Sequence, residues 1–168
     1  MSFCLLALTV GISKAQPNDT LLHAPFNLPD GTVQGPGNPP KWARNTSSAN
    51  LAPPFAHLEV KQNGFEAKRI NGEASLILDT VDASSGPPAR AIFYAEGTEL
   101  HSSDSILFEI KGENGGWYTY EKRGGSFSLD TIRSPFFNEK VLLRATVKHG
   151  MQGGGPNLER THRVELAK

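Results

Sequence analysis

From residue 57 onward, hydrophobic and polar residues alternate along several short segments of the chain. Between residues 141 and 148, every second residue is hydrophobic, and Arg144, Thr146 and Lys148 occupy positions between them. Such a period of two is typical of a β-strand with one face buried. Three other segments have the same period, with the inward sets Ala74, Leu76 and Leu78; Ala91, Phe93 and Ala95; and Ile106, Phe108 and Ile110.

Weaker alternation occurs at residues 57–62, 65–70, 117–121, 126–129 and 161–166. Glycine, proline or an Asn-Gly pair separates almost all of these segments, and no window of a dozen residues has a helical period. Short strands separated by turn residues are typical of an antiparallel sandwich. We therefore predict an all-β, immunoglobulin-like antiparallel sandwich over residues 57–168, in which two sheets bury the inward sets between them.

The segment 16–56 has a different composition. It contains eight of the 12 prolines and only four charged residues, and it shows no strand or helix period. Proline removes backbone donors and glycine adds chain entropy, so we expect a disordered, extended Pro/Gly-rich linker or tail. Trp42 is the exception, because a large aromatic side chain in such a segment is expected to pack against its own domain or to contact a ligand.

Residues 1–15 resemble a signal peptide. The apolar run from Phe3 to Ile12 is too short to span a bilayer, and Ser13-Lys14-Ala15 has small residues where a signal peptidase requires them. No lysine or arginine precedes the apolar run, so a buried N-terminal strand or a misplaced start is the alternative. Cleavage after Ala15 would remove Cys4 and leave a mature chain with no apolar run long enough to cross a membrane.

Two sequons for N-glycosylation, at Asn18 and Asn45, agree with secretion. Both lie in the proline-rich segment and neither lies in a predicted strand, which is where attached glycans would be tolerated. The sequence therefore predicts a secreted, extracellular glycoprotein.

Charge and cysteine content exclude several classes of protein. The 17 basic residues balance the 17 acidic residues, so the net charge of zero argues against binding to a nucleic acid. The single cysteine excludes an intramolecular disulfide framework and a cysteine-based zinc site.

Residues 89–166 resemble a known family. The segments AIFYAEGTEL (91–100), SFSLDT (126–131) and VLLRATV (141–147) are similar to strands of the immunoglobulin-like modules of bacterial secreted proteins, with Leu129 where tryptophan is usual. An insertion between Leu100 and Ser126 departs from the family pattern. The resemblance implies a sandwich of seven or more strands that acts beside catalytic or carbohydrate-binding domains or in cell-surface adhesins, without a cofactor or chemistry of its own.

No motif identifies a reaction. The five histidines lack the close spacing of metal sites, no Gly-x-Ser-x-Gly elbow is present, and no phosphate-binding motif follows the glycines at 150–155. Asp79 and Asp82 flank a loop and supply only part of a calcium site; turn-forming aspartates are the alternative. We expect a protein that is not an enzyme and has no cofactor or metal, and a small secreted hydrolase is the remaining catalytic reading.

The aromatic residues are the candidates for binding. Trp117, Tyr118 and Tyr120 belong to one short strand, so the tryptophan and the tyrosines should point to opposite faces. Phe136 and Phe137 follow a proline in a loop that should be polar. Exposed rings can stack on the sugars of a polysaccharide or anchor a neighbouring protein domain. The alternative is that the insertion folds back and makes these rings a small satellite core.

Overall fold

The computed structural model describes residues 13–14, 26–51, 56–62, 64–149 and 161–166, which form strands, turns and loops and no helix. The strands are β1 (Ser13–Lys14), β2 (Trp42–Asn50), β3 (His57–Lys61), β4 (Gly64–Lys68), β5 (Asn71–Leu78), β6 (Val81–Asp82), β7 (Ala89–Arg90), β8 (Ile92–Thr98), β9 (Ser105–Gly112), β10 (Tyr118–Gly124), β11 (Phe127–Arg133), β12 (Lys140–His149) and β13 (Thr161–Leu166). The predicted strands from residue 57 onward are confirmed, with ends that shift by a few residues.

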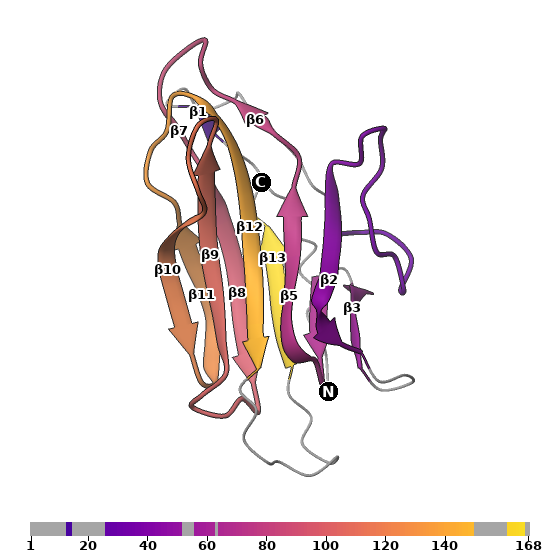
Figure 1. Cartoon of the computed structure of the whole chain (residues 1–168). Helices are drawn as coiled ribbons and strands as arrows, with labels where there is room; N and C mark the ends of the chain where they lie inside the picture. The colour runs from indigo at the N-terminus through magenta and orange to yellow at the C-terminus, as the bar shows by residue number, and fades with distance from the viewer. Residues whose placement is uncertain (1–12, 15–25, 52–55, 63, 150–160, 167–168) are drawn as a thin grey trace, which may run out of the picture.

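Two antiparallel sheets face each other and make the molecule a β-sandwich (Figure 1). The six-stranded sheet has the order β10-β9-β12-β5-β2, and β6 extends it by pairing with β12. The five-stranded sheet has the order β11-β8-β13-β4-β3. In addition, β1 pairs with β7, so the backbone of Ser13 and Lys14 lies beside Arg90 and Ala89. The all-β antiparallel fold class predicted from the alternation is confirmed.

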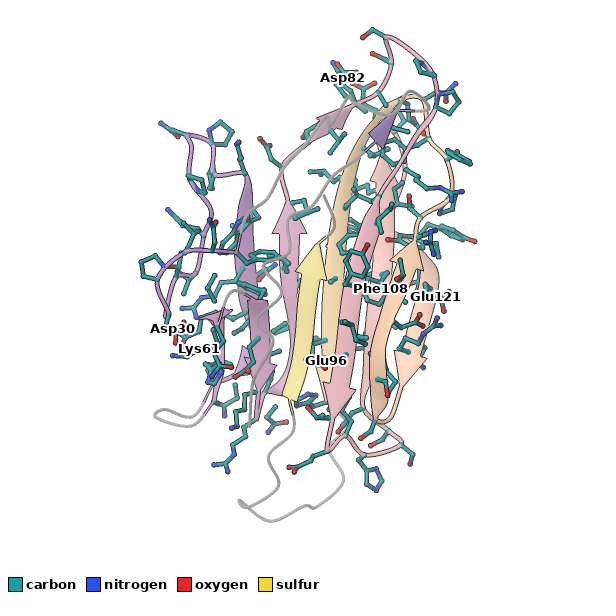
Figure 2. All side chains as sticks on the ribbon, turned by 180° about the vertical axis from the view of Figure 1, so that it is seen from behind. Asp30, Lys61, Asp82, Glu96, Phe108 and Glu121 are labelled. Carbon is teal, nitrogen blue, oxygen red and sulfur yellow. The ribbon has the colours of Figure 1, made fainter. Side chains whose placement is uncertain are left out.

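Aromatic side chains from both sheets meet in the core. Phe93 of β8 and Phe108 of β9 have ring centroids 5.4 Å apart, and Phe108 points into the space between the layers (Figure 2). Trp42 of β2 lies 5.2 Å from Phe65 of β4, with their rings nearly perpendicular. Edge-to-face pairs of this kind stabilise a core beyond the area that they bury. The predicted inward sets of β5 and β12 are buried in the same core.

The segment expected to be an unpacked linker contributes a strand to the sandwich. β2 pairs with β5, and the side chains of Phe26 and Trp42 are fully buried. The prediction therefore differs from the structure over residues 26–50, while residues 16–25 lie outside the described part. The reason is that β2 is an edge strand: Trp42 alone contributes a large side chain to the core, and the remaining positions are small or polar, so no alternation marks it.

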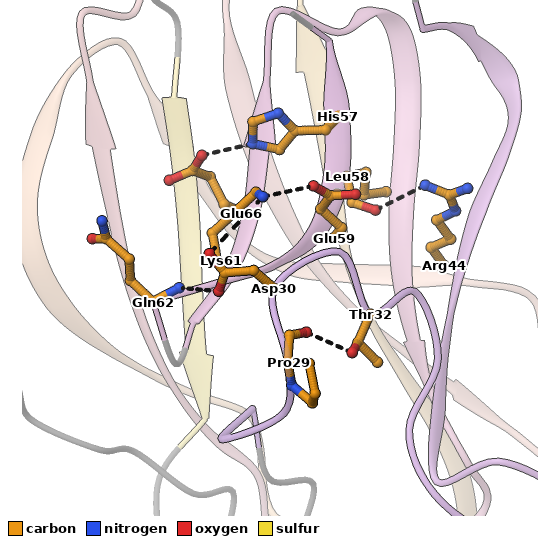
Figure 3. Close-up of polar contacts among 10 residues, drawn as sticks. All are labelled: Pro29, Asp30, Thr32, Arg44, His57, Leu58, Glu59, Lys61, Gln62 and Glu66. Carbon is orange, nitrogen blue, oxygen red and sulfur yellow. Dashed lines mark hydrogen bonds and ion pairs between the residues drawn. The ribbon is translucent and has the colours of Figure 1, made fainter. Parts of the chain in front are cut away.

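Hydrogen bonds hold residues 30–32 against β3 and against Gln62, which follows it (Figure 3). Asp30 Oδ1 accepts a hydrogen bond from the backbone N–H of Gln62 at 3.0 Å. The backbone N–H of Gly31 donates to the carbonyl of Val60 at 3.0 Å, and the N–H of Val60 donates to the carbonyl of Thr32 at 2.8 Å. These bonds attach the chain before β2 to the opposite sheet.

The signal-peptide core (residues 3–12) and Asn18 lie outside the described residues. No helix in the described part of the chain is long and apolar enough to cross a membrane.

Candidate functional site

Polar side chains gather on the outer face of the six-stranded sheet, the face turned toward the viewer in Figure 1. Arg144 and Thr146 point outward from the central strand β12. Their neighbours in register are Glu109 on β9, opposite Arg144, and Ser75 on β5, opposite Thr146. Glu109 and Thr146 are only 5% and 3% exposed although they face away from the core. We call Ser75, Glu109, Arg144 and Thr146 the outer polar cluster.

The outer polar cluster is joined by a continuous set of hydrogen bonds. Arg144 donates from Nε to Glu109 Oε2 at 2.7 Å and from Nη2 to Glu109 Oε1 at 2.9 Å, which is the bidentate arrangement that carboxylates prefer. Thr146 Oγ1 donates to Glu109 Oε2 at 2.6 Å. The hydroxyls of Ser75 and Thr146 are 3.0 Å apart. Because Thr146 gives its proton to Glu109, Ser75 must be the donor in this pair.

Glu109 is ionised at neutral pH. Burial alone would raise its pKa, but hydrogen bonds from Arg144 and Thr146, together with the charges of Arg144 and Lys148, hold the pKa below its ordinary value. The carboxylate therefore accepts hydrogen bonds and does not donate one. Its role in the cluster is to fix the positions of Arg144 and Thr146.

Trp117 extends the cluster toward β10. It precedes the first residue of that strand, and the guanidinium carbon of Arg144 lies 4.1 Å from the centroid of its ring. A cation over an aromatic face contributes a favourable interaction of about 0.5–2 kcal/mol. The indole is half-buried, so part of it remains accessible to solvent.

A shallow hollow of about 90 Å³ lies beside the cluster. Its lining residues come from β2, β5 and β12 and are all polar: Asn45, Ser47, Ser48, Glu73, Ser75, Arg144 and Thr146. The register of β2 against β5 shifts between Asn45 and Ser48, and Asn45 Oδ1 accepts a hydrogen bond from the N–H of Ser47 at 3.0 Å. This bulge brings the short polar side chains of β2 to the rim of the hollow.

The predicted aromatic residues do not form one group. Trp117 lies on the outer face, whereas Tyr120 packs against the core and its hydroxyl is buried without a hydrogen-bond partner among the described residues. Tyr118 is 63% exposed. The expectation placed both tyrosines on the face opposite Trp117; Tyr120 packs against the core, whereas Tyr118 is largely exposed, and the register of β10 shifts between Thr119 and Glu121.

The two phenylalanines that follow Pro135 also separate. Phe136 is 61% exposed, and the guanidinium carbon of Arg90 lies 3.9 Å from the centroid of its ring. Phe137 is 6% exposed and belongs to the core, where its backbone pairs with that of Ala89. Phe137 therefore differs from the binding residue expected from the sequence, because the bridge to β7 turns its side chain inward.

The described histidines His57 and His101 form hydrogen bonds with nearby side chains. His57 Nε2 lies 2.7 Å from Glu66 Oε1, and His101 Nδ1 lies 3.0 Å from Ser103 Oγ (His57 is shown in Figure 3). Asp104 Oδ2 accepts a hydrogen bond from the backbone N–H of His101 at 3.0 Å.

The aspartates considered for calcium make local hydrogen bonds. Asp79 Oδ1 accepts from the N–H of Thr80 at 2.8 Å, and Asp82 Oδ1 accepts from the N–H of Ser84 at 3.0 Å. Within the described ranges, no group of three or more His, Cys, Asp or Glu residues is placed to hold a metal ion.

Sequence reasoning missed the outer polar cluster. In the alternation of residues 141–148, Arg144 and Thr146 fall on the polar face of the strand, and the pattern does not indicate that Thr146 is buried and Arg144 half-buried. The available signal was Glu109, an acidic residue within the otherwise apolar run ILFEI of β9.

The chain is similar to a solved structure but matches no known family. No protein-family model matches the sequence, and no curated protein matches it. A solved structure of TmCBM61 in complex with beta-1,4-galactotriose is similar over 74% of this chain and 83% of that chain, with a TM-score of 0.46 and 10% sequence identity.

Proposed function

We propose that this protein is a non-catalytic glycan-binding module whose site is the outer polar cluster with Trp117 and the adjacent hollow. The observation that carries the proposal is the bidentate Arg144–Glu109 pair, held on a sheet face that no other described strand covers and lying directly against an indole ring. Sites for small ligands combine an apolar surface with a few precisely placed polar groups. Here the ring supplies a surface for stacking, and the fixed polar groups meet sugar hydroxyls.

The carboxylates at the site are suited to binding and unsuited to glycoside hydrolysis. Hydrolysis generally requires one carboxyl group that carries a proton at working pH and a second that remains free to act. Glu109 is held ionised by three hydrogen bonds. Glu73 forms an ion pair with Lys148 at 2.5 Å. Both acids are thus engaged in positioning their neighbours.

We propose further that the module acts outside the cell. The apolar run at residues 3–12 and the sequon at Asn18 support secretion. The similarity of residues 89–166 to immunoglobulin-like modules of bacterial secreted proteins supports a role beside other domains. Asn45 lines the hollow, so the proposed site requires that this sequon carries no glycan.

Depletion from solution by insoluble polysaccharides tests the glycan-binding proposal. We expect the wild-type protein to be retained on at least one polysaccharide and Trp117→Ala to bind at least tenfold more weakly. Phe136→Ala is the matched control, because it removes an aromatic ring that is also stacked on an arginine but lies at another place. Equal retention of wild type and Trp117→Ala would refute glycan binding at this site.

A second candidate function is docking of a neighbouring protein domain or a second copy through Phe136. The observation that favours it is the exposed ring held by Arg90. Self-association measured by sedimentation should then decrease in Phe136→Ala and remain unchanged in Trp117→Ala. A wild-type protein that stays monomeric and binds sugar would exclude self-association as its role.

A further inference from the structure

The charged side chains that line the hollow are all paired within the chain. Arg144 is bound by both oxygens of Glu109. Glu73 is paired with Lys148, which projects from the same face of β12 as Arg144. The site therefore contains two positive and two negative groups, and each positive group is neutralised by its own partner.

These pairs oppose the binding of an ionic ligand. A uronate or sulfate group that takes the Nε and Nη2 donors of Arg144 would have to replace a carboxylate that is bound in the bidentate geometry and largely withdrawn from water. Glu109 would then be left buried without its counter-ion, which is strongly unfavourable. A cationic ligand would have to separate Glu73 from Lys148 and would meet Arg144 close by.

The groups that remain at the hollow are suited to uncharged hydroxyls. Because Oδ1 of Asn45 is occupied by the N–H of Ser47, its amide N–H₂ is the group that it can offer a ligand. Ser75 gives its proton to Thr146 and retains acceptor lone pairs. Arg144 retains Nη1, to which no described residue is hydrogen-bonded. Donors and acceptors are thus interspersed, and a sugar hydroxyl can use both at once.

We propose that the ligand is a neutral glycan and that the site discriminates against uronic-acid-containing and sulfated polysaccharides. This inference rests on the proposed function, because it assigns a ligand class to the same site. Discrimination comes from the pairing of Arg144 and Lys148, since each cation that could attract an anionic sugar is already neutralised. Binding should accordingly depend little on ionic strength, unlike binding carried by exposed charges.

The test compares neutral and acidic polysaccharides by affinity electrophoresis and depletion, with wild type and Trp117→Ala in parallel. The neutral probes are galactan, mannan, xylan and mixed-linkage β-glucan; the acidic probes are polygalacturonan, alginate and dextran sulfate. We expect binding to at least one neutral probe that Trp117→Ala weakens at least tenfold and that changes less than twofold between 50 and 500 mM NaCl. For the acidic probes, we expect no binding that is lost in Trp117→Ala.

The Glu73→Gln variant tests the cause of the discrimination. It keeps the size of the side chain but leaves Lys148 without its partner, so we expect the ratio of acidic-probe binding to neutral-probe binding to rise at least threefold over that of the wild type. Wild-type binding to an acidic probe that depends on Trp117 would overturn the neutral-ligand inference and leave glycan binding intact. If no probe shows binding that depends on Trp117, both glycan binding and the neutral-ligand inference are overturned. If Glu73→Gln does not increase binding to acidic probes relative to the neutral probe, charge pairing is refuted as the cause of the discrimination.

Discussion

The guanidinium carbon of Arg144 lies 4.1 Å from the centroid of the Trp117 ring, while the same guanidinium is held by both carboxylate oxygens of Glu109. The orientation of the Trp117 ring therefore depends on the Arg144–Glu109 salt bridge, although Trp117 is not one of its partners. A site whose aromatic surface is fixed before the ligand arrives loses less conformational entropy on binding. Glu109 is in this sense a positioning residue for Trp117.

Glu109→Gln should destabilise the fold and weaken binding together. The substitution leaves Arg144 without a counter-ion and removes a charged acceptor from Thr146, so we expect the free energy of unfolding to fall by about 2 kcal/mol. Urea denaturation gives the measurement. The control is Glu73→Gln, which affects a more exposed pair and should cost less than about 1 kcal/mol. Unchanged stability of Glu109→Gln would contradict the structural role of the pair.

Acid should remove the contribution of Glu109. Its pKa in the folded protein lies below the ordinary value of 4.5, so the stabilisation is fully present above pH 4.5 and is lost as the pH falls through the lower folded value. Between pH 6 and pH 3, the midpoint temperature of thermal unfolding should decrease less for Glu109→Gln than for wild type. Parallel decreases in the two proteins would show that other carboxylates account for acid unfolding.

Removal of the Tyr120 hydroxyl should be neutral or stabilising. The hydroxyl is buried without a hydrogen-bond partner among the described residues, so Tyr120→Phe should raise the free energy of unfolding by up to about 1 kcal/mol. Burial and the charge of Glu121 both raise the pKa of this phenol above its ordinary value of 10.0. The free energy of unfolding of the wild type should therefore fall as the pH rises past 10, and that of Tyr120→Phe should fall less. A loss of stability in Tyr120→Phe at pH 7 would reveal a partner for the hydroxyl.

Trp42→Ala should unfold or severely weaken the protein. The indole is fully buried and contacts Phe26 and Phe65, so its removal should cost about 3–5 kcal/mol. Trp117→Ala, which truncates the other tryptophan outside the core, should change stability far less. Guanidinium denaturation followed by circular dichroism distinguishes the two. Similar stability of both variants would mean that the chain before residue 57 is not part of the folding unit.

Most of the sandwich could be predicted because the information is local. In β5, β8, β9 and β12, alternate residues contact the core, and a period of two is visible in the sequence alone. β2 could not be predicted in this way. Trp42 is buried by Phe65 from a distant strand, and the other residues of β2 are small or polar, so its sequence resembles that of a linker.

The candidate site was predicted only in part, because it depends on cross-strand register. Trp117 was identified from its type and its position in a short strand. Glu109, Arg144 and Thr146 are ordinary polar residues until β9 and β12 are placed side by side, and only then does each become the partner of another. The sequence favours a surface position for Phe137, because no sequence pattern indicates the β-bridge between its backbone and Ala89.

The chain contains two tryptophans, and the structure gives them different surroundings. Trp42 is enclosed by other aromatic rings in the core, whereas Trp117 is half-buried beneath a guanidinium at the candidate site. Their fluorescence consequently reports on different events. Emission from Trp42 follows the integrity of the core, and emission from Trp117 follows what approaches the outer face. The protein thus carries intrinsic optical probes for folding and for ligand occupancy, in separate places.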